Sequence, residues 1–290
     1  MSVDSWADTA RRYDYRQRTE HQIAIDTIVT LLKGHIDAKS AADTIASNYE
    51  PLLKQGLNPS PVATLWDVIC DAARVLGNRK EIAARLIGLL NSISALKDVT
   101  DDHGNAITPP GSSVGVYWRD LPELTMVFRE SGMDIEPMEY FKEGGSWDDQ
   151  AVPLLNATTF AAMYLVDGHK PIGMPFHAEV SLMQGIEVPC DTPEQQRFAN
   201  MYVPPAATWI LLAGASIYQL CKTDYNRKDG APGSTPNNVE WLWGKGRGYS
   251  LERWNFWRGR FSDLARTQNL SDEIKNIASQ AASAMEKCGS

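Results

Sequence analysis

Apolar residues recur at three- and four-residue spacing along most of the chain. One such stripe contains Ile25, Ile28, Val29, Leu32 and Ile36. This spacing places apolar side chains on one face of an α-helix, the face that packs into a core. The sequence contains no sustained alternation of β-branched and polar residues, so it predicts helices rather than a sheet. We therefore predict an all-α fold, a single orthogonal bundle of many helices.

Local signals mark where several of these helices begin. Ser60 precedes Pro61, and Thr192 precedes Pro193. A hydroxyl at the N-cap can accept a hydrogen bond from a backbone N–H of the first turn. Proline suits the first helical position because the N–H that it lacks would have no partner there. Ser250, with the acidic Glu252 two residues later, predicts another helix start.

Two segments rich in Gly, Pro, Asp and Asn interrupt the helical pattern, at residues 98–115 and 222–238. The chain has 290 residues, a length that suits one large domain or two modest ones. We predict one helical domain over residues 1–290. The first loop is a candidate boundary between sub-bundles at 1–98 and 116–290.

Composition and charge exclude some partners. The chain carries 28 Lys and Arg against 36 Asp and Glu, a net charge of −8, whereas nucleic-acid binders need an excess of cations. The most apolar stretch, residues 206–220, is too short and too polar to span a membrane. The first residues do not resemble a secretory signal. We expect a cytoplasmic protein that binds neither nucleic acid nor a membrane.

The most distinctive segment runs from Trp241 to Ser250 and contains three alternate glycines with Lys245 and Arg247 between them. The glycines allow tight turns, and the helix that follows offers free N–H groups beside two cations. One interpretation is a docking point for an anionic group of a ligand. The other is a structural latch, in which the tryptophans, Trp243 among them, fill the core.

Other candidate groups also have two interpretations. Asp67 and Asp71 share one helix face and could hold Mg²⁺, but no second metal motif accompanies them, so a solvated face or cap is the alternative. His177 follows a Pro- and Gly-rich turn and is either a general acid or base, or a packed side chain. We expect no metal and no cofactor.

In the helix after Ser250, one apolar stripe is formed by Trp254, Trp257, Phe261 and Leu264. Its 3-4-3 spacing is typical of a buried helix face. Arg253 and its neighbours can stack on such rings or pair with carboxylates. The stripe therefore predicts a core contact first and a ligand contact second.

Three motifs resemble a family of fungal proteins known as the domain of unknown function number thirty-six thirty-two. They are the run from Trp241 through Trp257, the apolar helix that begins Tyr202-Val203-Pro204-Pro205, and the element Trp118-Arg119-Asp120-Leu121-Pro122. The resemblance covers most of the chain from about Ile25 onward. It implies a soluble helical protein of filamentous fungi, and it brings no established catalytic residues.

Two hypotheses about function follow. The first is a cofactor-independent, non-redox enzyme of fungal specialised metabolism, a lyase, isomerase or cyclase that acts on an apolar small molecule in a helical pocket. The second is a non-catalytic module that binds a small molecule or another protein. For the enzyme, the candidate catalytic residues are His177, Lys245 and Arg247, and the candidate substrate-binding residues are Trp118, Tyr202, Trp209, Trp243 and Trp257.

Overall fold

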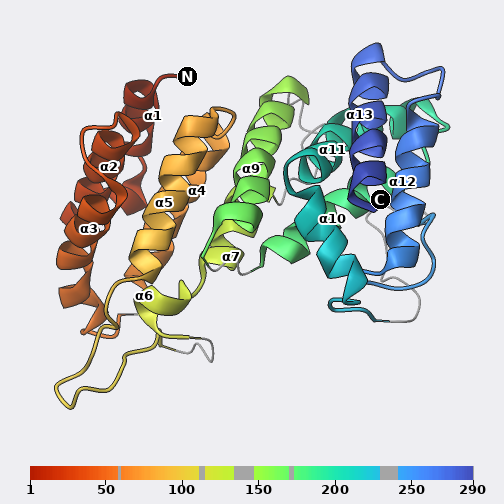
Figure 1. Ribbon diagram of the computed structural model, residues 1–290. Coiled ribbons are helices and arrows are strands. Elements are labelled where there is room, and N and C mark those ends of the chain that lie inside the picture. Colours follow the sequence, from red (N-terminus) through yellow and green to blue (C-terminus); the bar gives the residue numbers. More distant parts are fainter. Residues whose placement is uncertain (58–59, 111–114, 134–146, 170–172, 229–240, 290) are drawn as a thin grey trace. The chain divides into compact units, whose positions relative to one another are not determined.

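The computed structural model describes residues 1–290 except 58–59, 111–114, 134–146, 170–172, 229–240 and 290 (Figure 1). The described residues form helices and connecting loops, with two isolated β-bridges and no strand. The predicted all-α, multi-helix fold is confirmed. The chain forms two compact units. Unit 1 comprises Met1–Gly145, Val152–Phe160 and Asp167–Ile172, and unit 2 comprises Ser146–Ala151, Ala161–Val166 and Gly173–Ser290.

Unit 1 is built from helices and short helical turns. They are α1 (Val3–Ala10), the 3-10 turn η1 (Asp14–Arg16), α2 (Thr19–Leu32), α3 (Ala38–Leu53), α4 (Pro61–Leu76), α5 (Lys80–Ser94), α6 (Tyr117–Asp120), α7 (Leu124–Phe128) and a π-helical turn η2 (Arg129–Met133). Helix α3 packs against α2 and α5, and α4 packs against α7 (Figure 1). The loop after α5, proposed from the sequence as a boundary, belongs to unit 1.

Helix α9 (Trp147–Asp167) contributes residues to both units. Unit 2 otherwise contains α10 (Met174–Ile186), α11 (Pro193–Lys222), α12 (Leu251–Leu264) and α13 (Asp272–Gly289). Helix α11 packs against α10 and α13, and α12 packs against α13. The apolar stretch at 206–220 lies inside α11, which bends where Ala213 leaves helical geometry. None of the helices within the described ranges has the length and apolar character needed to cross a membrane.

The start signals in the sequence correctly predicted where several helices begin. Pro61 is the first residue of α4, although the Ser60 hydroxyl before it makes no capping hydrogen bond. Thr192 forms a reciprocal capping box with Gln195 at the start of α11. The Ser250 hydroxyl accepts from the Arg253 N–H, 3.1 Å away, at the start of α12. The predicted helix face extends to Ile36, but α2 ends at Leu32. The helix stops there because Gly34, just after it, adopts the left-handed conformation.

Candidate functional site

A small polar recess lies at the N-terminal end of α12. It is lined by Arg227, Trp243, Lys245, Arg247, Gly248, Ser250, Glu252 and Arg253, and its volume of ≈ 20 Å³ has room for about one water molecule. Gly248 is required here: its φ is +82°, and a Cβ would approach the Asn226 carbonyl oxygen to 2.2 Å. The structure thus brings together three residues proposed from the sequence, Trp243, Lys245 and Arg247.

Behind the recess lies a buried ion network around Arg253, called here the Arg253 centre. The Arg253 side chain is 1% exposed. Its guanidinium donates two hydrogen bonds to Glu187, from Nε to Oε1 at 2.7 Å and from Nη2 to Oε2 at 3.0 Å. Its Nη1 donates to Glu179 Oε1 at 2.8 Å and to the Gly248 carbonyl at 2.6 Å. This geometry is the bidentate recognition for which a planar guanidinium is suited.

Both carboxylates of this centre accept several hydrogen bonds. Glu179 Oε1 accepts from Arg247 Nε at 3.1 Å and from the Gly248 N–H at 2.7 Å as well as from Arg253. Glu187 Oε1 also accepts from the Trp257 indole N–H at 2.5 Å. Burial raises the pKa of Glu187, although Arg253 and Trp257 favour its charged form. These contacts make the centre a structural anchor that joins α10 to the start of α12.

The remaining sequence candidates do not line the recess. Tyr202 and Trp209 are buried on α11, and the Trp209 indole N–H has no hydrogen-bond partner in the described part of the chain. His177 is buried on α10 beside Phe176 and does not line the recess. Trp118 belongs to unit 1, where its indole N–H donates to Glu50 at 3.4 Å.

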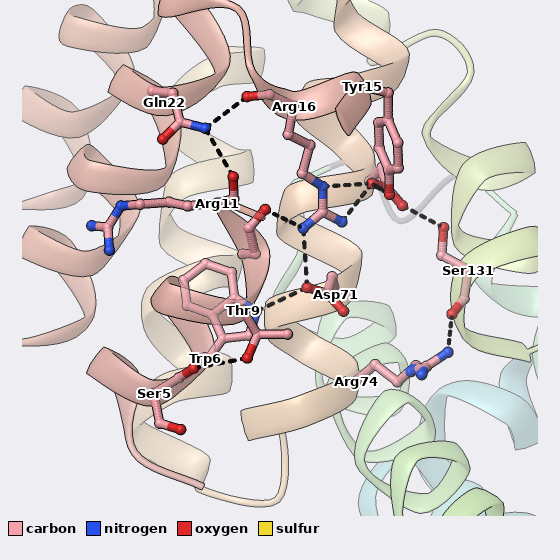
Figure 2. A network of polar contacts seen from close by, with 12 residues as sticks. Ser5, Trp6, Thr9, Arg11, Tyr15, Arg16, Gln22, Asp71, Arg74 and Ser131 are labelled. Carbon is pink, nitrogen blue, oxygen red and sulfur yellow. Dashed lines mark hydrogen bonds and ion pairs between the residues drawn. The ribbon is translucent and has the colours of Figure 1, made fainter. Parts of the chain in front are cut away.

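Unit 1 contains its own buried arginine, Arg16, at the end of η1 (Figure 2). Its guanidinium binds Asp67 Oδ2 through Nη2 at 2.5 Å and Nε at 3.0 Å, and Asp71 Oδ2 through Nη1 at 3.2 Å. The Trp6 indole donates to Asp71 at 3.0 Å, and the Tyr15 hydroxyl to Asp67 at 2.9 Å. We call this network the Arg16 centre. The aspartates weighed as Mg²⁺ ligands therefore face a guanidinium.

The Arg16 centre joins three parts of unit 1. Trp6 and Arg16 come from the first sixteen residues, and the two aspartates from α4. The Ser131 hydroxyl, from η2, donates to Asp67 Oδ1 at 3.2 Å (Figure 2). Burial and the neighbouring Asp67 carboxylate raise the pKa of Tyr15 to about 12, which keeps its hydroxyl a donor.

A strained turn between α6 and α7, called here the elbow, comprises Leu121, Pro122 and Glu123. Leu121 and Glu123 have φ values of 46° and 68°, a left-handed conformation that is costly for residues other than glycine. The Trp66 indole donates to the Pro122 carbonyl at 2.7 Å and fixes the turn against α4. One carboxylate oxygen of Glu123 is buried there without a hydrogen-bond partner among the described residues.

A family model described as "Protein of unknown function (DUF3632)" matches residues 66–261, more than half of the chain. The chain belongs to this family. The matched range includes most of α4, the elbow and the Arg253 centre, whereas Arg16 precedes it. No curated protein and no solved structure matches the chain.

Sequence reasoning missed the acidic half of the Arg253 centre. Glu187 stands in an apolar run, Gly185-Ile186-Glu187-Val188-Pro189, and a lone charge in such a run is a signal for a buried pair. It also missed Glu123, because its left-handed backbone has no marker such as glycine.

Proposed function

We propose that the protein binds a small molecule through an anionic group, a carboxylate or a phosphate, at the recess beside α12. The observation that carries this proposal is that the carboxylates of the site are buried while two of its cations are more exposed. The acidic groups Glu179 and Glu187 lie behind the recess and are held by Arg253, whereas Lys245 and Arg247 are more exposed. A small anion in the recess would meet these cations and the first N–H groups of α12.

The volume of the recess limits what it can enclose. With room for about one water-sized group, it accepts part of a carboxylate or phosphate and leaves the rest of the ligand outside. An apolar ring system does not fit in this recess. The proposal therefore concerns recognition of a charged group, and it corresponds to the binding-module hypothesis more closely than to the enzyme hypothesis.

The local charge balance sets how strong such binding is. The four cations of the lining pair with four carboxylates, so 4 − 4 leaves no net charge: Arg227 pairs with Asp224, Lys245 with Glu252, Arg247 with Glu179, and Arg253 with both Glu179 and Glu187. The ion pair of Lys245 with Glu252 is exposed, and exposed pairs contribute only about 0–1 kcal/mol. An anionic ligand can therefore compete with Glu252 for Lys245. We expect weak binding that depends on this competition.

Substitution of each partner of this pair tests the proposal. In Glu252→Gln, Lys245 loses its competing carboxylate, and inorganic phosphate or acetate should bind several-fold more tightly than to the wild type. Lys245→Met should weaken the binding of both phosphate and acetate. Lys275→Met is the matched control, since this ion-paired lysine on α13 does not line the recess.

Backbone amide chemical shifts of residues 243–252, followed in an NMR titration at constant ionic strength, measure the affinity. Equal shifts for phosphate and acetate assign general anion recognition, and a preference for one assigns the ligand class. If Glu252→Gln and Lys245→Met titrate like the wild type, the recess is a structural feature only.

The enzyme hypothesis stays a prediction. A lyase, isomerase or cyclase of fungal specialised metabolism would need His177, Lys245 and Arg247 to meet one substrate, and His177 does not line the recess. Docking of another protein also stays a prediction.

A further inference from the structure

An antiparallel bridge beside the recess pairs two cationic residues, Lys228 and Arg247. The Lys228 N–H donates to the Arg247 carbonyl at 3.0 Å, and the Arg247 N–H donates to the Lys228 carbonyl at 2.9 Å. Residues that exchange both hydrogen bonds lie directly opposite each other, and their side chains leave the same face of the pair with Cβ atoms about 4.5–5.5 Å apart. The bridge therefore makes neighbours of a lysine and an arginine, although like charges in this arrangement are destabilising.

The two side chains keep donors that the described part of the chain does not use. Lys228 is exposed and forms no ion pair with the described residues. Arg247 donates to Glu179 through Nε alone, so within the same ranges the other four of its five N–H donors, on Nη1 and Nη2, have no acceptor. The Arg247 side chain lines the recess and is 35% exposed, so an anion that enters the recess can reach these donors.

We propose that the anionic group recognised at this site is a diphosphate. One phosphoryl group enters the recess, and the second binds between the Lys228 ammonium and the terminal nitrogens of Arg247. The inference rests on the proposed function and narrows its ligand class to two linked phosphates. A guanidinium donates paired N–H groups to phosphate oxygens, and a lysine adds a compact positive charge. Because the cations that line the recess are balanced by carboxylates, Lys228 supplies the positive charge in excess.

Smaller anions and neighbouring acids use this arrangement less completely. A single carboxylate or phosphate in the recess would leave Lys228 and Arg247 side by side without an anion between them. Of the nearby acids, Asp224 pairs with Arg227 at 3.5 Å, and Glu252 pairs with Lys245. A second phosphoryl group brings the negative charge that this cation pair lacks.

Titration of the protein with three anions at constant ionic strength tests the inference. The anions are inorganic phosphate, inorganic diphosphate and citrate, and the backbone amide chemical shifts of Lys228 and of residues 243–252 report binding. Citrate carries several negative charges but no phosphoryl group, so it separates the effect of charge from that of phosphate geometry. We expect diphosphate to bind about ten-fold more tightly than phosphate, because it gains charged hydrogen bonds to a second cation. Citrate should bind no more tightly than phosphate.

Variants of Lys228 locate the second phosphoryl group. Lys228→Met should weaken diphosphate binding several-fold and leave phosphate binding unchanged, since Lys228 does not line the recess. Lys228→Arg should retain tight diphosphate binding. Lys222→Met is the matched control, because Lys222 is an exposed lysine of the same segment that lies over the Tyr218 ring and does not line the recess. Without ligand, Lys228→Met should be at least as stable to urea as the wild type, since it loses a like-charged neighbour.

The outcomes separate this inference from the proposed function. If neither phosphate nor diphosphate binds, both are wrong. If phosphate binds and diphosphate binds no more tightly, or if Lys228→Met weakens the two equally, the recess recognises a single anionic group and the diphosphate site is wrong. If citrate binds as tightly as diphosphate, the surface attracts multivalent anions without recognising phosphates, which also overturns the inference.

Discussion

Both units contain an almost completely buried arginine held by two carboxylates, but the surroundings of the carboxylates differ. The Arg16 side chain in unit 1 is 2% exposed and that of Arg253 in unit 2 is 1% exposed. The partners of Arg16, Asp67 and Asp71, keep 22% and 17% of their side chains exposed. The partners of Arg253, Glu179 and Glu187, keep only 7% and 1%.

The comparison teaches that the cost of breaking a buried ion pair depends on the carboxylate left behind. Water can reach Asp67 and Asp71 when their arginine is removed, and it then replaces part of the lost interaction. Water cannot reach Glu187 without opening unit 2, so its charge would stay uncompensated in a buried site. We therefore expect the two centres to respond unequally to the same substitution.

The largest effect is expected for Arg253→Met. Removal of one partner from a buried ion pair costs about 3–5 kcal/mol, and here two carboxylates and the Gly248 carbonyl lose a donor together. Urea unfolding measures the loss of stability, and hydrogen exchange of the α10 and α12 amides assigns it to unit 2. Arg266→Met, an exposed arginine just after α12, is the control and should change stability by less than about 0.5 kcal/mol. Equal stability of the two variants would contradict an anchoring role for the Arg253 centre.

A smaller effect is expected for Arg16→Met, about 1–3 kcal/mol, because the freed aspartates are partly hydrated. The loss should appear in the amides of α1 and α4, which the network joins. The exposed Arg18, two residues later, provides the matched control as Arg18→Met. If Arg16→Met costs as much as Arg253→Met, residual exposure of the carboxylates does not decide the cost.

The two aspartates of the Arg16 centre should also differ from each other. Asp67 accepts two bonds from Arg16, one from Tyr15 and one from Ser131, whereas Asp71 accepts one from Arg16 and one from Trp6. We expect Asp67→Asn to cost about 2 kcal/mol and Asp71→Asn about 1 kcal/mol. The double variant should cost a different amount from the sum, because residues in one network couple. Exact additivity would show that Arg16 binds them independently.

Features that depend on residues close together in the sequence could be predicted, whereas contacts between distant residues could not. Thr192, Ser250 and Pro61 marked helix starts because caps act within one turn. The helical spacing of Asp67 and Asp71 correctly placed two carboxylates on one face. Their partner Arg16 lies 51 residues from Asp67. Only tertiary packing selects such a partner, so the sequence left open a metal site or a solvated face or cap and did not predict the ion pair.

Glu123 provides the opposite case to both centres, a buried carboxylate oxygen without a guanidinium, and the smallest expected effect. Burial raises its folded-state pKa, so its contribution to stability is fully present below the unfolded pKa of about 4.3 and is lost as pH rises through the folded pKa. Glu123→Gln should therefore gain stability over the wild type as pH rises from about 4 to 7. Because the group is partly exposed, the gain should stay below about 1 kcal/mol.

Urea unfolding of both proteins across this pH range measures the difference, and Glu130→Gln, which removes an exposed carboxylate from the same region, provides the baseline. If the wild type instead became more stable than the Glu123→Gln variant as pH rises, a cation within the protein would already compensate the charge of Glu123. The carboxylate would then belong with the paired groups of the two arginine centres, and the contrast between paired and unpaired buried acids would not hold in this chain.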